Sequence, residues 1–137
     1  PLSTVKCHLV VLPPQAQKEA GCLSALERLA NVVGNTGAKA VFYAAPATLD
    51  LIRERFARSS NEIGYVPFVN WEDFLIVSRD VRTDDTLWIW MSRRNGVSYE
   101  SSMARVSRYL DQYFKGNNFV LVYPLQASID EGSRYLT

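Results

Sequence analysis

The chain has 137 residues, of which 47% are hydrophobic and 21% are charged, and this size suits one domain around a single core. Its net charge is only +1, which gives little electrostatic support to nucleic-acid binding. The longest apolar runs are far shorter than the roughly 20 residues needed to cross a bilayer.

The N-terminal part predicts a strand and then a helix. In residues 5–14, a continuous apolar run from Leu9 to Leu12 indicates a strand buried on both faces, as in a parallel sheet, and two prolines end it. Residues 17–37 carry apolar side chains at helical spacing, and Gly34 or Gly37 would end this helix. Its predicted inner face consists of Leu23, Leu26, Ala30 and Val33.

A second strand and helix follow, and then a weaker strand. Residues 39–45 form the short strand, and Pro46 fits the first turn of the next helix. Gly64 and Pro67 make a strand at residues 62–69 more acceptable at the edge of a sheet than at its centre. The inner stripe of the helix would be Leu49, Ile52 and Phe56, while Arg53, Arg55 and Arg58 would lie on a solvated face with local ion pairs.

The second half of the chain repeats this alternation. Residues 70–81 predict a short helix with Asn70 as its cap and acids in its first turn. Residues 83–92 predict a strand that is entered through a polar turn containing Asp84 and Asp85. These two acids would lie at the amino end of the strand, where capping the turn is the expected role.

The C-terminal part predicts a helix over residues 98–118, with Ser98 as its cap and Gly116 as its stop. A last apolar strand follows at residues 119–125, and residues 126–137 read as a polar tail or short turn. The inner face of the helix would be Met103, Val106, Leu110 and Tyr113.

Strands and helices alternate throughout, which predicts a parallel sheet covered on both sides within one α/β domain over residues 1–137. The first, fourth and fifth strands are the most continuously apolar, so we expect them to be central. Trp88 and Trp90 alternate within the fourth strand and should therefore face the same side, where they would pack against a helix.

The stretch "TLWIWMSRRNGVSYESS" at residues 86–102 suggests a site. In open parallel sheets, ligands bind beyond the carboxyl ends of the strands, near helix N-termini with unpaired N–H groups. Arg93 and Arg94 would follow the fourth strand there, Gly96 lets a backbone approach a ligand, and Ser98 offers a hydroxyl. This arrangement suits an anion. The alternative is a hydrophilic loop with a serine cap and solvated arginines.

The sequence lacks the G-x-x-x-x-G-K-[ST], G-x-G-x-x-G and G-x-S-x-G motifs. Its single histidine, His8, is expected to be a strand residue with a satisfied side chain rather than a base or a metal ligand. Cys7 and Cys22 are expected to be free thiols in a reducing compartment. We therefore expect a non-enzyme with no metal and no cofactor. No signal peptide is visible, and with Pro1 in place of an initiator methionine we expect a piece of a longer protein.

One family shares an ordered pattern with the segment that ends at Gln126. A polar Asp-Asp turn leads into an apolar strand, a loop, a helix ending in Tyr113-Phe114, and then an N-x-F-x-x-x-Y-P-x-Q run. In this order the segment resembles the cytosolic C-terminal domain of bacterial and plant monovalent cation/proton antiporters, the sodium or potassium exchangers. The loop residues that carry the resemblance are Ser92, Arg94, Gly96, Ser98 and Tyr99.

That family's domain is similar to universal stress proteins. The resemblance implies a three-layer α/β/α domain, a five-stranded parallel sheet of order 3-2-1-4-5, and a homodimer. It also makes the five loop residues a ligand or contact site, which Arg93 joins on the anion argument. Universal stress proteins that bind ATP carry G-x-x-G-x(9)-G-[ST] after strand four and an acid after strand one. Here only Gly96 lies in that window and Leu12 is followed by prolines, so the ATP motif is not intact.

The resemblance implies a regulatory domain at the cytoplasmic face of the inner (plasma) membrane, joined in cis to a transmembrane antiporter. It would modulate transport through dimer contacts or through a small anionic or nucleotide ligand. The alternative is a stand-alone nucleotide-binding protein of the universal stress type. A hydrolase or transferase has the least support, because no nucleophile–base pair is visible.

Overall fold

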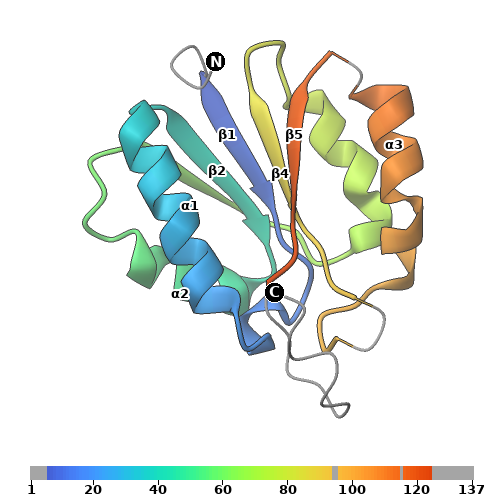
Figure 1. The fold of residues 1–137 in the computed structure, drawn as a ribbon, viewed down its shortest axis with the longest axis horizontal. Coiled ribbons are helices and arrows are strands. Elements are labelled where there is room, and N and C mark those ends of the chain that lie inside the picture. Colours follow the sequence, from blue (N-terminus) through green and yellow to red (C-terminus); the bar gives the residue numbers. More distant parts are fainter. Residues whose placement is uncertain (1–5, 94–95, 115, 125–137) are drawn as a thin grey trace.

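The computed structural model describes residues 6–93, 96–114 and 116–124. Five strands form one parallel sheet of order β3-β2-β1-β4-β5, which confirms the predicted α/β class and strand order (Figure 1). The strands are β1 (Cys7–Val11), β2 (Lys39–Ala44), β3 (Ile63–Pro67), β4 (Thr86–Trp90) and β5 (Asn118–Val122). The α-helices are α1 (Cys22–Thr36), α2 (Pro46–Arg55) and α3 (Val106–Tyr113), and the 3₁₀ helices are η2 (Ala16–Lys18), η3 (Trp71–Arg79) and η4 (Ser101–Arg105).

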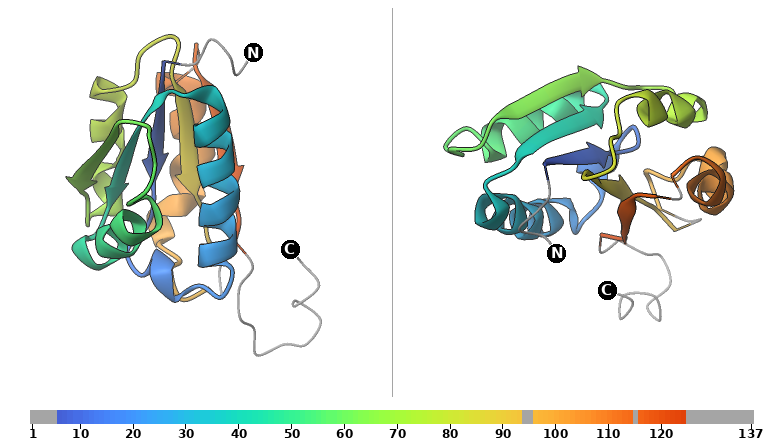
Figure 2. Two further views of the ribbon diagram at one scale, coloured as in Figure 1. Left: turned by 90° about the vertical axis from the view of Figure 1, so that its left-hand side faces the viewer. Right: turned by 90° about the horizontal axis from the view of Figure 1, so that it is seen from above.

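Helices lie on both faces of the sheet, in three layers (Figure 2). One apolar core lies between the sheet and α1 with α2, and it includes Leu26, Phe42 and Trp90. The other lies between the sheet and η3 with α3, and it includes Phe74 and Leu110. Alternate residues of each strand enter opposite cores, as the two-residue period of a strand requires. Within the described ranges, no helix combines the length and apolarity needed to span a membrane.

The first helix begins later than the sequence suggested and ends where it suggested. Gly37 follows α1 with a φ of 68°, a conformation that suits glycine, and its N–H donates to the carbonyl of Val33. One expectation is wrong, because Leu23 is exposed and Ala30 only half-buried. The buried stripe is rotated toward Cys22, Ala25, Leu26, Leu29 and Val33.

The predictions for α2, β3 and η3 are confirmed in their main features. Pro46 is the first residue of α2, and β3 is an edge strand. Asn70 accepts a hydrogen bond from the N–H of Glu72 and so caps η3, which is a 3₁₀ helix with a kink at Asp73. As expected, Leu49, Ile52 and Phe56 are buried, and Arg53 forms a local, exposed ion pair with Asp50. The ion pair of Arg55 is not local, because its partner is Glu27 on α1.

The helix expected at residues 98–118 is shorter and divided. The chain first forms η4 and then α3, which ends at Tyr113. Ser98 is therefore not a helix cap, and the residue before η4 is Glu100, whose side chain makes no capping bond. Tyr113 is exposed, whereas Phe114 is buried in the core. The inward stripe continues one residue further along the chain than predicted.

The fifth strand contradicts the expectation of a central position. β5 lies at the edge of the sheet, where only β4 pairs with it. Phe119 is 45% exposed and Val120 is 37% exposed. A continuous apolar strand usually has cover on both faces, but nothing in the described part of the chain covers this one completely. β5 therefore carries apolar side chains that the described part of the chain leaves partly exposed.

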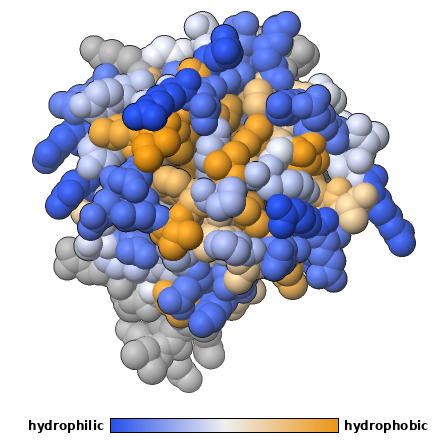
Figure 3. Space-filling view, turned by 180° about the vertical axis from the view of Figure 1, so that it is seen from behind, coloured by the Kyte–Doolittle hydropathy of each residue, from blue (hydrophilic) through white to orange (hydrophobic). Residues whose placement is uncertain are grey.

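The two cysteines are free thiols, as predicted. Cys22 is buried and Cys7 is half-buried, and burial raises the pKa of each thiol to about 11. Thiols with such pKa values are poor nucleophiles near neutral pH, because the thiolate is the reactive form. On the side of the molecule opposite to the view of Figure 1, hydrophobic residues lie in patches among hydrophilic ones (Figure 3).

Candidate functional site

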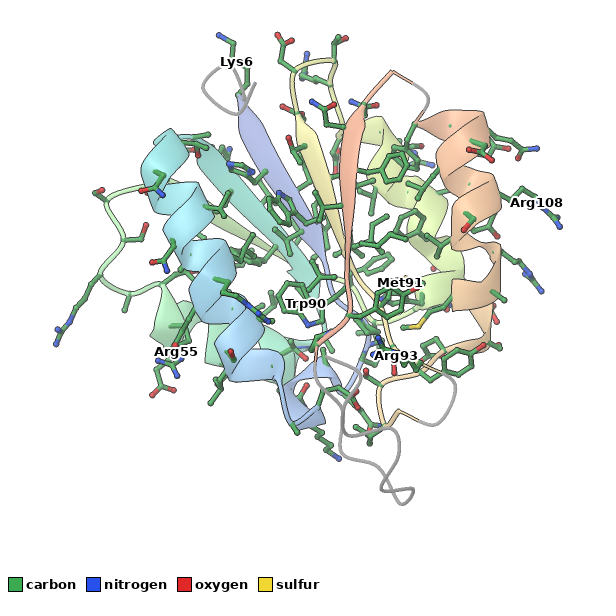
Figure 4. The ribbon with its side chains drawn as sticks, in the orientation of Figure 1. Lys6, Arg55, Trp90, Met91, Arg93 and Arg108 are labelled. Atoms are coloured by element: carbon green, nitrogen blue, oxygen red, sulfur yellow. The ribbon has the colours of Figure 1, made fainter. Side chains whose placement is uncertain are left out.

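The segment predicted as a site does follow β4 at the carboxyl end of the sheet. Figure 4 shows Trp90, Met91 and Arg93 close together there. The Arg93 guanidinium lies over the Tyr123 ring, 5.1 Å from its centroid, and thus links the end of β4 to the end of β5. Ser92 is buried, and its hydroxyl donates to the carbonyl of Arg93. Arg94 lies outside the described residues.

A buried carboxylate meets this segment from the turn between η2 and α1. Glu19 is 5% exposed, and its Oε1 accepts a hydrogen bond from the backbone N–H of Ser98, 3.3 Å away. Ser98 is itself buried, and its Oγ has no hydrogen-bond partner in the described structure. An internal carboxylate thus occupies the backbone donor that an external anion would need. Sequence reasoning missed Glu19, because its distance along the chain from Ser98 leaves no local pattern.

The remaining predicted residues do not converge on one point. Gly96 donates its N–H to the carbonyl of Arg93 and so closes a turn. Tyr99 is half-buried and packs against the core beneath η3 and α3, on the other face of the sheet from α1. Of the neighbouring serines, Ser101 is exposed and Ser102 is buried. The segment therefore serves mainly to connect the two cores across the end of β4.

A groove of about 320 Å³ lies between α1 and the β4–β5 side of the sheet. It exists because α1 covers the sheet beside β1 and no described helix covers the same face beside β5 (Figure 2). The groove is mainly apolar, and Arg28 is its one charged lining residue in the described chain. It is lined by Ala25, Arg28, Leu29, Val32, Trp88, Trp90, Leu121, Val122 and Tyr123.

A second cavity, of about 370 Å³, lies near the amino end of β1. Lys6, Lys39 and Arg82 line it together with Asp80 and Asp85. Several of these charges already have partners: Lys39 pairs with Glu62 at 3.1 Å, Asp80 accepts from the Tyr43 hydroxyl, and Asp85 accepts the N–H of Arg82. The last bond confirms that Asp85 caps the turn before β4. The mixture of both signs favours no single ligand charge.

His8 has hydrogen-bond partners for both of its ring nitrogens, which confirms the prediction of a satisfied side chain. His8 is fully buried on β1, where its Nδ1 accepts the indole N–H of Trp88 at 3.1 Å and its Nε2 lies 2.9 Å from Thr36 Oγ1. Thr36 Oγ1 in turn donates to the carbonyl of Val33. Trp88 is half-buried and lines the groove, whereas Trp90 beside it is buried.

Comparison of the chain with protein-family models, with curated proteins and with solved structures gave no match. Within the described ranges, no group of three or more His, Cys, Asp or Glu side chains is placed to hold a metal ion. The features that bear on function are therefore the segment after β4, the groove, and the open edge of β5.

Proposed function

We propose that this chain is a regulatory domain that works by self-association along β5, and that its parent is a monovalent cation/proton antiporter. The domain would lie at the cytoplasmic face of the inner membrane as part of that membrane protein. Two chains would pair through their β5 strands, and the state of this contact would bias transport. The first part rests on the structure of β5, and the second on the ordered residue pattern between Asp84 and Gln126.

The apolarity of β5 at an open edge carries the proposal. Residues 116–124 contain no charged side chain, and Phe119, Val120 and Tyr123 are exposed large hydrophobics. An edge strand also offers unpaired backbone donors and acceptors, and an exposed hydrophobic edge is a template for pairing with another chain. A second copy of the chain would both cover the exposed apolar side chains and pair with the free backbone donors and acceptors of β5.

The backbone of β5 is oriented for such a pair. The carbonyl of Val122 accepts the N–H of Met91, so Val122 directs its backbone groups toward β4. Because backbone direction alternates along a strand, Phe119 and Leu121 direct theirs outward. An antiparallel β5–β5 pair would make the same contacts on both chains, which is the arrangement of a two-fold symmetric dimer.

The segment after β4 supports a structural role better than an anion site. Glu19 already accepts the Ser98 N–H, so this backbone donor is not available to an external anion. Arg93 stacks on Tyr123, which ties this segment to the end of β5. In the proposed function these residues hold the end of β5 in place, and dimer contacts rather than a ligand carry regulation.

Sedimentation velocity over a range of chain concentrations tests self-association. We expect the wild-type chain to dimerise and Val120→Lys to weaken the dimer about 100-fold, because the change buries an unpaired charge in the contact. Val66→Lys on β3 is the matched control, since Val66 is 39% exposed and Val120 is 37% exposed. A wild-type chain that stays monomeric, or equal effects of the two variants, would refute the proposal.

The antiporter part has its own test, which is the coding sequence that adjoins the chain in its genome. We expect it to encode, in the same reading frame, a series of apolar segments of roughly 20 residues each. A reading frame without such segments would remove the transporter from the proposal and leave self-association to be judged separately.

A further inference from the structure

Hydrogen bonding fixes the protonation state of His8. An indole N–H can only donate, so the His8 Nδ1 that receives Trp88 must carry a lone pair. The proton therefore lies on Nε2, which donates to Thr36 Oγ1, and Thr36 donates onward to Val33. One directional chain of bonds thus joins β4 to β1 and to the last turn of α1. It is complete only while His8 is neutral.

An unused acceptor lies beside His8. Thr86 is the register partner of His8 in the parallel pair β1–β4, so their side chains project from the same face of the sheet on adjacent strands. Thr86 is 1% exposed, and its Oγ1 has no hydrogen-bond partner in the described structure. A buried hydroxyl without a partner is costly in a folded protein. Its oxygen can accept a hydrogen bond from an Nδ1–H group, which the neutral ring does not have.

Among the described residues, Asp85 is the charged group that acts on the His8 ring. From the start of β4, the negative charge of Asp85 favours the protonated form, although burial disfavours it more and lowers the pKa of His8 from its ordinary value. From β2, Lys39 is exposed and pairs with Glu62. The last turn of α1 contributes no basic residue. The ring is therefore neutral near neutral pH, and it takes up a proton only at a pH below the ordinary pKa of an imidazole.

We propose that protonation of His8 transfers its Nδ1 from Trp88 to Thr86 Oγ1, releases the Trp88 side chain, and thereby weakens self-association at β5. When Nδ1 gains a proton it becomes a donor that faces another donor, so the bond to Trp88 breaks. The new N–H donates to Thr86 Oγ1, and Nε2 keeps its bond to Thr36. No group is consumed, because the proton comes from solvent and returns to it.

The link from Trp88 to β5 is direct. Trp88 is the register partner of Val120, and it lines the groove together with Val122. While it is bonded to His8, its ring forms a fixed part of the apolar surface beside the open edge. Once released, the ring must be immobilised again when two chains pair, which costs about two- to tenfold in affinity. This inference rests on the proposed function for its second half only.

The first half is read from the indole ¹H–¹⁵N resonances of the full chain between pH 8 and the pH at which circular dichroism first shows unfolding. We expect the Trp88 resonance to move in a one-proton transition with a midpoint below 6.5, the ordinary imidazole value. Trp71 and Trp90 are internal controls, because their indole nitrogens have no partner in the described structure. A Trp88 resonance that stays fixed until unfolding would overturn the inference.

Two variants separate His8 from other titrating groups. His8→Gln keeps an acceptor for Trp88 and a donor for Thr36 but cannot titrate, so the Trp88 transition should vanish. Thr86→Val removes the Oγ1 acceptor while keeping the shape of the side chain. The pH midpoint of the Trp88 transition should therefore fall by about half a unit or more. Thr83→Val, in the exposed turn before β4, is the matched control and should leave the midpoint unchanged. A midpoint that Thr86→Val does not lower would overturn the role of Thr86.

The second half is read by sedimentation velocity on either side of the measured midpoint. We expect the dimer of the wild-type chain to be about two- to tenfold weaker on the acid side, and that of His8→Gln to be independent of pH. A Trp88 transition without any change in association would overturn the coupling. A chain that is monomeric at neutral pH would refute the proposed function and this coupling together, while the Trp88 resonance would still decide whether His8 exchanges its partners.

Discussion

β3 and β5 form the two edges of one sheet, and each has five residues. They differ in the backbone groups that they present to a neighbouring strand. β3 contains Pro67, which has no N–H to offer. Phe68 donates its N–H to the carbonyl of Ala44, so by alternation Pro67 faces outward, where a neighbouring strand would need a donor. β5 has no proline, and neither strand contains a charged side chain.

The side chains of β3 are also better covered. The Tyr65 ring stacks on Phe42 at a centroid distance of 6.2 Å, and the Arg53 guanidinium lies 4.7 Å from the Tyr65 centroid. Val66 nevertheless exposes as much of its surface as Val120 does. The difference between the edges is therefore in the backbone donor that Pro67 lacks and in the Arg53 cover over Tyr65, rather than in the exposure of a single apolar residue.

The largest expected effect is on the free energy of unfolding, and it compares a residue of the core with a residue of the β5 edge. Phe42→Ala should lower the free energy of unfolding by about 3–5 kcal/mol, because Phe42 is fully buried against Phe56 and Tyr65. Phe119→Ala should lower it by less than about 1 kcal/mol in the monomer, because Phe119 is 45% exposed. Urea unfolding of both variants at low chain concentration measures this. Equal losses would show that β5 is as important to the fold as the interior is.

The next effect comes from giving β5 the protection that β3 has. Phe119→Pro places a proline at an outward-facing position, so the bonds to β4 are kept while the outer donor is removed. We expect the dimer to weaken about 100-fold in sedimentation velocity, since bonds at the centre of the paired strands are lost. Phe119→Val, which keeps the N–H, is the control. If proline and valine weaken association equally, side chains rather than the backbone hold the contact.

The sequence predicted most of the fold, because the signals were local. The strand order of the sheet came from the resemblance, and the alternation of elements came from periodic apolar positions such as those of α2. The position of β5 by pattern alone was wrong, since "FVLVYPL" reads as a buried strand. An apolar strand that will be covered by a second chain has the same composition as one covered by its own helices.

The candidate site was less accessible to sequence reasoning. The loop after β4 was placed correctly at the carboxyl end of the sheet, but its contact with Glu19 joins residues 79 positions apart. The bond between His8 and Trp88 spans 80 positions. Neither pair leaves a spacing signal, and both depend on the strand register of β1 and β4. Ser98 resembled a helix cap, yet the helix begins later because η4 precedes it.

Removing the proline from β3 is the reverse of introducing one into β5, and it should make the edge of β3 available for pairing. Pro67→Val restores an outward N–H beside Val66, so we expect β3 to gain a tendency to pair, about tenfold above the wild-type level at equal concentration. Combining it with Val120→Lys isolates this edge, because β5 association is then suppressed. Sedimentation velocity of the double variant against Val120→Lys alone measures the gain. A double variant that stays as monomeric as its parent would mean that charge and side-chain cover, rather than Pro67, protect β3.

The smallest effect concerns the cover over Tyr65. Arg53→Met keeps the aliphatic stem but removes the cation above the ring, and it should lower the free energy of unfolding by about 0.5–1 kcal/mol. Asp50→Asn is the control, since it removes only the exposed Asp50–Arg53 ion pair. Burial raises the pKa of Tyr65, while the charge of Arg53 lowers it. Removing that charge should therefore move the Tyr65 ionisation to higher pH in an ultraviolet titration. A pKa that stays constant in Arg53→Met would show that the guanidinium does not act on the ring in solution, and that β3 depends on Pro67 for its protection.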